Sequence, residues 1–176
     1  MLDRVREAMF ATLTPRIEDA RVLDLFAGSG SLGLEALSRG ARAARLVEQH
    51  PATLRLLREN VTALGLDEHV EIVRADALAP KSWRGGELFG HEALYDLIFM
   101  DPPYARVEDP RARRAVFDAL VKLVREHLVG EGYLVLHTPR RLLGGEDFAP
   151  DLVTALRQYG SSALWYVARA NAETVA

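Results

Sequence analysis

Four consecutive residues, Asp101, Pro102, Pro103 and Tyr104, follow directly after the mostly apolar segment 95–100 in this chain of 176 residues. Because proline cannot donate to a strand ladder, the pair predicts a stiff loop at the exit of a buried strand. The Asp101 carboxylate and the Pro102 carbonyl can accept hydrogen bonds from an exocyclic amine, while Tyr104 stacks on the ring. We therefore predict the capture of a planar, amine-bearing substrate; the alternative is a rigid turn with a surface tyrosine.

A second group of residues has the spacing of a nucleoside site. Gly28, Gly30 and Gly33 form a G-x-G-x-x-G pattern after the apolar segment 21–26, and Glu48 follows 20 residues after Gly28. The glycines permit close approach of a ligand to the backbone, and an acidic residue at that spacing can accept hydrogen bonds from both ribose hydroxyls. The alternative is a plain tight turn, but the placement of Glu48 favours a nucleoside cofactor.

The charge near the glycines favours one cofactor over another. Asp24 stands four residues before Gly28, where it would repel the pyrophosphate that a nicotinamide dinucleotide sets over a helix N-terminus. A carboxylate there could instead attract the sulfonium and ammonium groups of S-adenosylmethionine, so we expect this cofactor. Two alternatives stay open: Asp24 could be a structural cap of the turn, and Asp76 could contact the adenine amino group or be an ordinary loop carboxylate.

Apolar spacing predicts the elements that must position these residues. The expected strands are 21–26, 43–47, 70–73, 95–100, 133–137 and 162–169. The expected helices are 4–13, 32–38, 51–64, 113–127 and 152–159. Alternating strands and helices imply an α/β fold with a mostly parallel, doubly wound sheet, to which we add an antiparallel C-terminal strand. Such sheets bind ligands at the carboxyl ends of their strands. We expect Trp83 to anchor a loop in the core rather than to stack on a base.

The composition, 49% apolar and 27% charged residues, is that of one ordinary globular domain over residues 1–176. The absence of cysteine excludes a disulfide framework, a thiolate nucleophile and a cysteine-ligated metal. The histidines at 50, 69, 91, 127 and 137 lack ligand spacing, so we expect no metal. No apolar run approaches the ~18 residues of a membrane span, and the start does not resemble a signal peptide. We expect a cytoplasmic protein.

The net charge of −3 does not by itself indicate a nucleic-acid-binding protein. All but two of the 22 basic residues are arginine, whose planar fork suits phosphate groups and stacking on bases. A GC-rich genome could produce the same bias. Arg111, Arg113, Arg114, Arg140 and Arg141 could contact phosphates near the site, although solvated faces explain them as well.

Two longer segments point to a known family. Residues 22–30, Val-Leu-Asp-Leu-Phe-Ala-Gly-Ser-Gly, together with 101–104 resemble the class I S-adenosylmethionine-dependent amino-methyltransferases. More narrowly, residues 3–10, Asp-Arg-Val-Arg-Glu-Ala-Met-Phe, and 33–41, Gly-Leu-Glu-Ala-Leu-Ser-Arg-Gly-Ala, resemble the RsmD family. Members of that family methylate the N2 amine of a guanine in bacterial 16S rRNA. The resemblance runs from about residue 3 to 140 and is weaker beyond.

The resemblance implies a Rossmann-like class I methyltransferase fold, S-adenosylmethionine as cofactor, and 16S rRNA or the assembled 30S subunit as partner, with neither membrane nor metal. It assigns catalysis to Asp101, Pro102, Pro103 and Tyr104. It assigns cofactor binding to Asp24, Phe26, Ala27, Gly28, Ser29, Gly30, Glu48, Asp76 and Ala77.

The motifs leave three alternatives to this function. The residues 101–104 alone would also suit adenine N6 in DNA. A non-catalytic nucleotide-binding module for rRNA assembly is disfavoured by an intact Asp-Pro-Pro-Tyr, and a nicotinamide dehydrogenase is disfavoured by Asp24. Family members usually open with a basic arm before the first helix, and we expect that arm to be absent here, because the sequence begins almost at the helix.

Overall fold

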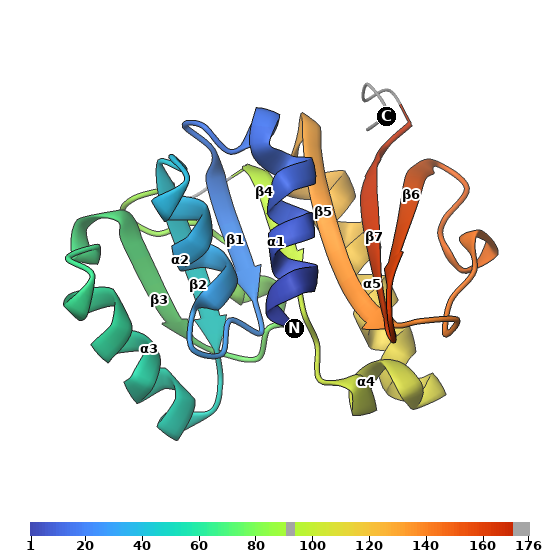
Figure 1. The fold of residues 1–176 in the computed structure, drawn as a ribbon, viewed down its shortest axis with the longest axis horizontal. Coiled ribbons are helices and arrows are strands. Elements are labelled where there is room, and N and C mark those ends of the chain that lie inside the picture. The colour runs from blue at the N-terminus through green and yellow to red at the C-terminus, as the bar shows by residue number, and fades with distance from the viewer. Residues whose placement is uncertain (91–93, 171–176) are drawn as a thin grey trace.

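The computed structural model describes residues 1–90 and 94–170, and its strands form one sheet in the order β3-β2-β1-β4-β5-β7-β6 (Figure 1). The strands are β1 (Arg21–Leu25), β2 (Ala43–Glu48), β3 (Val70–Arg74), β4 (Tyr95–Met100), β5 (Leu128–Pro139), β6 (Leu152–Tyr159) and β7 (Ser162–Arg169). The first five strands pair in parallel, whereas β7 runs antiparallel to β5 and to β6. The expected α/β fold is therefore confirmed.

The strand order reverses at β1, which lies between β2 and β4: β2 and β3 are added on one side of β1, and the later strands on the other. Leu25, the last residue of β1, is in register with Val47 on β2 and with Met100 on β4. The next residues along these three strands therefore reach one edge of the sheet together. In doubly wound sheets the ligand site lies at this edge, where the strand order reverses.

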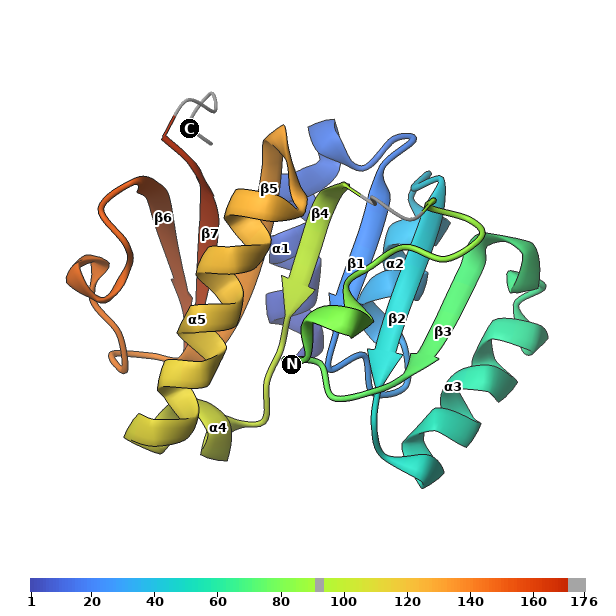
Figure 2. The same ribbon diagram turned by 180° about the vertical axis from the view of Figure 1, so that it is seen from behind.

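Helices cover both faces of the sheet. They are α1 (Asp3–Leu13), α2 (Ser31–Ser38), α3 (Pro51–Ala63), α4 (Tyr104–Glu108) and α5 (Pro110–Glu126), with short 3₁₀ turns η1 (Thr14–Arg16), η2 (Asp67–His69), η3 (Pro80–Ser82) and η4 (Gly145–Asp147). Figure 1 shows α1, α2 and α3 in front of the sheet, and Figure 2 shows α5 on the opposite face.

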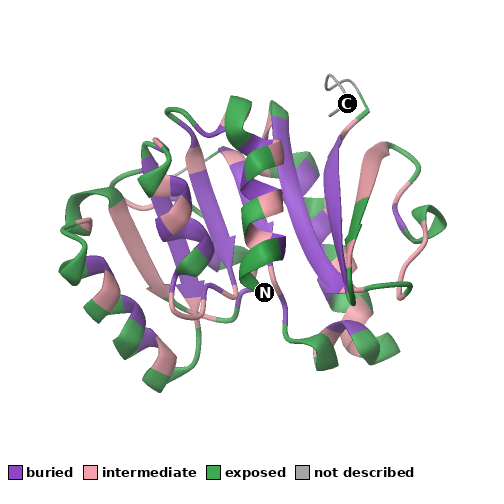
Figure 3. Ribbon diagram, in the orientation of Figure 1, coloured by how far each residue is buried: buried purple, intermediate pink, exposed green. Residues whose placement is uncertain are grey.

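The central strands are buried on both faces, because successive side chains point to opposite sides of the sheet. Val22 and Phe99 pack with Phe10 of α1 in one core, and Leu23 and Ile98 contribute to a second core with α5. Figure 3 shows the consequence: β1, β4, β5 and β7 are largely buried, while the edge strands β3 and β6 are only partly so. A rigid sheet therefore supports the edge where the chemistry-bearing residues gather.

The expected helix over 152–159 is wrong, because these residues form strand β6. They pair antiparallel with β7 along their whole length, from Leu152 opposite Arg169 to Tyr159 opposite Ser162. Gly160, with φ +57°, provides the positive φ that a two-residue hairpin turn requires. Eight residues are too few for the apolar period to separate helix from strand, so the pairing with β7 decides the structure.

Trp83 anchors the segment between β3 and β4, as expected. It is 1% exposed, its Nε1–H donates to the carbonyl of Ala77 at 2.7 Å, and its carbonyl accepts from the hydroxyl of Tyr95 at 2.7 Å. An indole held in the core in this way cannot stack on a substrate base. The indole thereby fixes the backbone at Ala77, a residue that lines a cavity at the carboxyl edge of the sheet.

Candidate active site

A cavity of about 830 Å³ opens at the carboxyl edge of the sheet, where the chain segments that follow β1, β2, β3 and β4 meet. This volume lies within the range of sites that bind small molecules. Eight of the predicted site residues line the cavity: Phe26, Gly28, Glu48, Ala77, Asp101, Pro102, Pro103 and Tyr104. Five others do not: Asp24, Ala27, Ser29, Gly30 and Asp76.

The loop after β1 has a left-handed backbone at Phe26 (φ +63°), Gly28 (φ +60°) and Gly30 (φ +88°). Gly28 lines the cavity, and a Cβ there would make only an ordinary contact, 3.9 Å from the carbonyl oxygen of Phe26, but at an unfavourable φ. At Gly30 a Cβ would lie 2.6 Å from Cδ1 of Leu57. Only the first of these two glycines therefore faces a ligand, while the second allows α2 and α3 to pack closely.

Glu48 ties this loop to the end of β2. Its Oε2 accepts the N–H of Gly28 at 3.0 Å, and its Oε1 accepts the N–H of His50 at 2.7 Å. Each carboxylate oxygen can accept more than one hydrogen bond. Glu48 is thus fixed in position at the cavity wall and still has acceptor sites for the hydroxyls of a ligand.

Asp24 lies under the cavity rather than in its wall. The residue is 1% exposed, and its Oδ2 accepts the N–H of Gly33 at 2.9 Å. Burial raises the pKa of Asp24 to about 7 against the opposing hydrogen bond from Gly33, and the nearby carboxylates of Asp101 and Glu48 add to the rise. Three carboxyl groups thus act on one another around the cavity, an arrangement that favours a cationic ligand.

Asp76 and Ala77 are adjacent but face different ways. Ala77 is buried at the cavity wall. The Oδ1 of Asp76 accepts the N–H of Leu78 at 3.1 Å and lies 3.8 Å from Nη1 of Arg106 in α4. A direct contact between Asp76 and a cofactor therefore stays a prediction.

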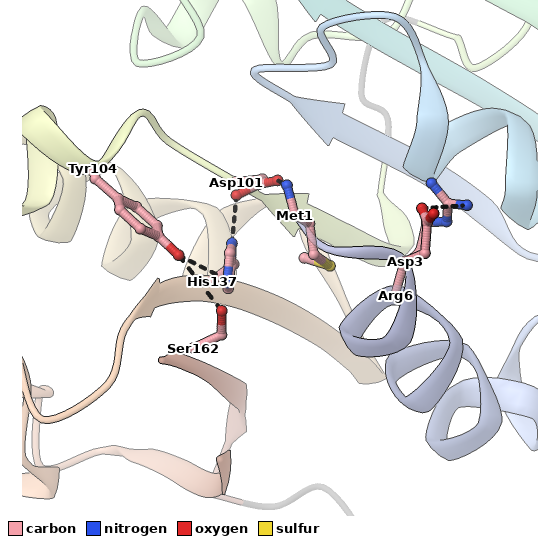
Figure 4. Close-up of polar contacts among 7 residues, drawn as sticks. All are labelled: Met1, Asp3, Arg6, Asp101, Tyr104, His137 and Ser162. Carbon is pink, nitrogen blue, oxygen red and sulfur yellow. Dashed lines mark hydrogen bonds and ion pairs between the residues drawn. The ribbon is translucent and has the colours of Figure 1, made fainter. Parts of the chain in front are cut away.

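Asp101 follows β4 and points toward the end of β5 (Figure 4). Its Oδ1 lies 2.7 Å from Nδ1 of His137, and its Oδ2 lies 3.3 Å from the ammonium group of Met1. Burial by itself would raise the pKa of Asp101, but the hydrogen bond and charge of His137, together with the Met1 ammonium, lower it below its usual value. Asp101 is therefore an ionised acceptor at neutral pH, so the Nδ1–H of His137 donates to it.

Tyr104, the first residue of α4, lies at the rim of the cavity and is 40% exposed. Its hydroxyl is 3.5 Å from Nε2 of His137 and 3.5 Å from Oγ of Ser162 (Figure 4). The hydroxyl is thus directed inward toward β5 and β7, and part of the ring remains open to a planar ligand.

Sequence reasoning missed several lining residues, among them His137 and Ser162. In the sequence, His137 stood out only as a histidine without metal-ligand spacing. One signal was available: it is the polar last residue of the otherwise apolar expected strand 133–137, at the edge where parallel strands meet. For Ser162 no signal existed, because its place depends on the hairpin that brings β7 beside β5.

In residues 1–90 and 94–170, no group of three or more acidic or histidine side chains could hold a metal ion; His91 lies outside these ranges. In the same ranges, no helix combines the length and the hydropathy needed to cross a membrane.

Comparisons with known proteins give consistent matches. The model of a family described as conserved hypothetical protein 95 matches residues 1–167. The ribosomal RNA small subunit methyltransferase D of Escherichia coli (strain K12) is 40% identical over 104 residues, which are 59% of this chain and 48% of that protein. The chain thus spans about half the length of the first curated relatives that it matches.

Two other similarities extend over most of the chain. YlbH of Bacillus subtilis (strain 168), whose name gives rRNA methyltransferase as a provisional activity, is 31% identical over 160 residues, 90% of this chain and 80% of that protein. The solved structure of Escherichia coli yhhF, provisionally titled a methyltransferase, has a TM-score of 0.75 at 28% identity and covers 96% of this chain and 87% of its own.

Proposed function

Since the chain belongs to the RsmD family, described as conserved hypothetical protein 95, we propose that it is an rRNA methyltransferase. The reaction is transfer of a methyl group from S-adenosylmethionine to the exocyclic N2 amine of a guanine in 16S rRNA of the small ribosomal subunit. The proposal treats the chain as one catalytic domain. One observation carries the proposal: two groups of residues line the same cavity. The first is Glu48 with the glycine loop that it holds, and the second is Asp101 with Tyr104.

The cavity residues fit S-adenosylmethionine. The remaining acceptor sites of Glu48 suit the two ribose hydroxyls, and Gly28 puts no side chain at the cavity wall. Phe26 and Ala77 give the cavity apolar surface for the adenine ring. The carboxyl groups of Asp24, Glu48 and Asp101 suit the two positive charges of this molecule. When bound, S-adenosylmethionine supplies an electrophilic methyl group.

The target amine needs help from the protein because its lone pair is delocalised into the guanine ring. Asp101 is an ionised acceptor at the cavity wall, and the carbonyl of Pro102 is a second acceptor that we assign to the same amine. Two acceptors that hold the amine hydrogens out of the ring plane direct the lone pair toward the methyl carbon. As the new nitrogen–carbon bond forms, the sulfur–methyl bond would break and leave its electron pair on sulfur. The methylated amine then loses one proton, for which Asp101 is a suitable acceptor.

Tyr104 and the stiff loop provide positioning. The partly exposed ring of Tyr104 offers a face on which a base can stack once it is unstacked from its neighbours. Pro102 and Pro103 restrict the backbone between Asp101 and Tyr104, so the hydrogen-bonding group and the stacking group keep one relative placement. Positioning of this kind can account for effective molarities of about 10⁵ M or more.

The test measures incorporation of labelled methyl groups into 30S subunits, naked 16S rRNA and duplex DNA from cells that lack the modification, followed by nucleoside analysis. We expect N2-methylguanosine from one or both rRNA substrates. N6-methyladenine in the DNA would overturn the substrate assignment. No product in any sample, with S-adenosylmethionine bound as measured by calorimetry, would overturn the proposed reaction and favour a non-catalytic module.

A further inference from the structure

We propose that His137 is a positioning residue of this site, whose Nδ1–H fixes one oxygen of Asp101 so that the other is presented to the substrate amine. The inference rests on the proposed function, because it gives Asp101 an amine to bind. It adds a residue that neither motif in the sequence contains.

Geometry and burial support this role. His137 is 2% exposed, and its Nδ1 is 2.7 Å from Oδ1 of Asp101, a short distance for a nitrogen-to-oxygen hydrogen bond. The side chain of Asp101 remains 21% exposed at the cavity wall. Its Oδ2 also lies 3.3 Å from the Met1 ammonium, a longer contact than the one His137 makes to Oδ1, so a substrate amine would share or replace that contact. Figure 4 shows the imidazole between Asp101 and the hydroxyl of Tyr104.

The sheet keeps His137 in place. It lies in β5, opposite Leu164 of β7, and its neighbours on either side are also paired with that strand. Its second ring nitrogen, Nε2, is 3.5 Å from the hydroxyl of Tyr104, which in turn is 3.5 Å from Ser162. The buried ring of His137 therefore contacts both Asp101, which we assign to the amine at the edge of the substrate base, and Tyr104, which we assign to the face of that base.

The charge balance at Asp101 makes this role measurable. His137 and Asp101 have three titratable or charged neighbours: the hydroxyl of Tyr104, the Met1 ammonium and, at longer range, the carboxyl group of Asp24. The pKa of Asp24 is in turn raised by the carboxylate of Glu48. Burial raises the pKa of Asp101, whereas the hydrogen bond and charge of His137 lower it. Without the imidazole donor, the carboxyl group takes up a proton at a higher pH and stops accepting from the amine.

Two amide variants test whether an N–H donor must stand at the place of Nδ1 of His137, rather than elsewhere on the side chain. In His137→Asn the amide N–H can occupy the place of Nδ1, while in His137→Gln the longer side chain carries it toward the place of Nε2. We expect H137Q to lower kcat roughly tenfold to hundredfold, with the KM for S-adenosylmethionine unchanged. We expect the acid limb of the pH–rate profile of H137Q to move to higher pH, and H137N to recover most of the rate and of the profile.

A matched control is His69→Gln in η2, an exposed histidine in the turn that precedes β3. We expect wild-type kcat and an unchanged acid limb for H69Q. Thermal unfolding of all three variants shows whether a loss of rate reflects a loss of fold. Equal rates and equal acid limbs for wild type, H137N and H137Q would overturn the role of His137.

A measurement without turnover distinguishes this inference from the proposed function. In the wild-type protein, ¹⁵N shifts of the imidazole report which nitrogen carries the proton, and the ¹³C shift of the Asp101 carboxyl carbon reports its titration. We expect a proton on Nδ1 of His137 and a higher carboxyl pKa in H137Q than in wild type or H137N. An Nε2–H tautomer with an Asp101 titration that H137Q does not change would overturn the inference, even if the wild-type enzyme is active. A wild-type protein inactive on every substrate would overturn the proposed function, and the NMR result would then still decide whether His137 holds Asp101.

Discussion

The carboxylate of Glu48 accepts the backbone N–H of Gly28 at 3.0 Å, across 20 residues of sequence. The bond joins the end of β2 to the loop after β1, so one acidic side chain shapes the glycine loop and faces the cavity that both line. The residue that we propose to bind the ribose and the glycine loop at the cavity are therefore not independent. A change at Glu48 affects both.

Replacement of Glu48 by alanine should weaken S-adenosylmethionine binding more than it slows the reaction at saturating cofactor. A hydrogen bond to a charged group contributes about 1.5–3 kcal/mol, so we expect the dissociation constant to rise by a factor of roughly 10 to 100. Isothermal titration calorimetry measures this directly. Glu68→Ala, at an exposed carboxylate in η2, is the control, and equal affinities for both variants would contradict the role of Glu48.

Replacement of Asp101 by alanine should lower kcat by about 10²–10³, by analogy with other preorganised hydrogen-bonding sites. Cofactor affinity should fall less than kcat, because Asp101 is assigned to the amine and only its charge acts on the cofactor. Incorporation of labelled methyl groups into rRNA at saturating cofactor measures the effect, and circular dichroism confirms the fold. A folded D101A that retains full turnover would rule out this assignment.

Tyr104 allows a matched pair of substitutions. Tyr104→Phe keeps the ring and loses only the long contacts of the hydroxyl with His137 and Ser162. Tyr104→Ala removes the stacking surface, which is worth about 1–3 kcal/mol per base. We expect the KM for rRNA to rise roughly tenfold or more in Y104A and to remain near wild type in Y104F. If both variants lose the same affinity, the hydroxyl rather than the ring holds the substrate.

Asp24 should make the fold less stable as the pH rises. Its pKa is about 7 in the folded protein and 3.8 in an unfolded chain, so the folded state binds this proton more tightly. The stabilising contribution is complete below about pH 4 and is lost as the pH rises through about 7, with a total on the order of 4 kcal/mol.

The variant Asp24→Asn, whose side-chain oxygen can still accept from Gly33, should lack this part of the pH dependence. Urea unfolding between pH 4 and pH 8 measures it: the stability of D24N relative to wild type should increase over this range. A constant difference between the two proteins would show that Asp24 is ionised in the fold throughout.

Gly33 should not tolerate alanine, for a reason of packing rather than of backbone conformation. A Cβ there would overlap Cδ2 of Leu46 and lie 3.3 Å from Oδ2 of Asp24, beneath the cavity. We expect a loss of about 1–3 kcal/mol in the free energy of unfolding. Gly145→Ala is the control, since nothing lies within 4 Å of a Cβ there. Unfolding free energies of G33A and G145A that agree within error would contradict this packing role.

Local sequence determined the parts of this protein that depend on short-range chemistry. The alternation of strands and helices gave the fold class, because burial on both faces of a parallel sheet requires continuous apolar runs. The glycines after β1 and the prolines after β4 marked two loops at carboxyl ends of strands, since only those residue types suit such backbones. These loops were predicted to hold the site, and eight of the predicted site residues line the cavity, including Glu48 and Ala77 from outside the two loops.

Tertiary structure decided what depends on contact between distant segments. Residues 152–159 became a strand only because β7 pairs with them. His137 reached Asp101 across 36 residues because β5 lies beside β4. Asp24 lies under the cavity because Gly33 of α2, which has no side chain, leaves room for its carboxyl group and donates a hydrogen bond to it. A sequence pattern fixes the period of a segment, but the partner that each side chain meets depends on how whole elements pack.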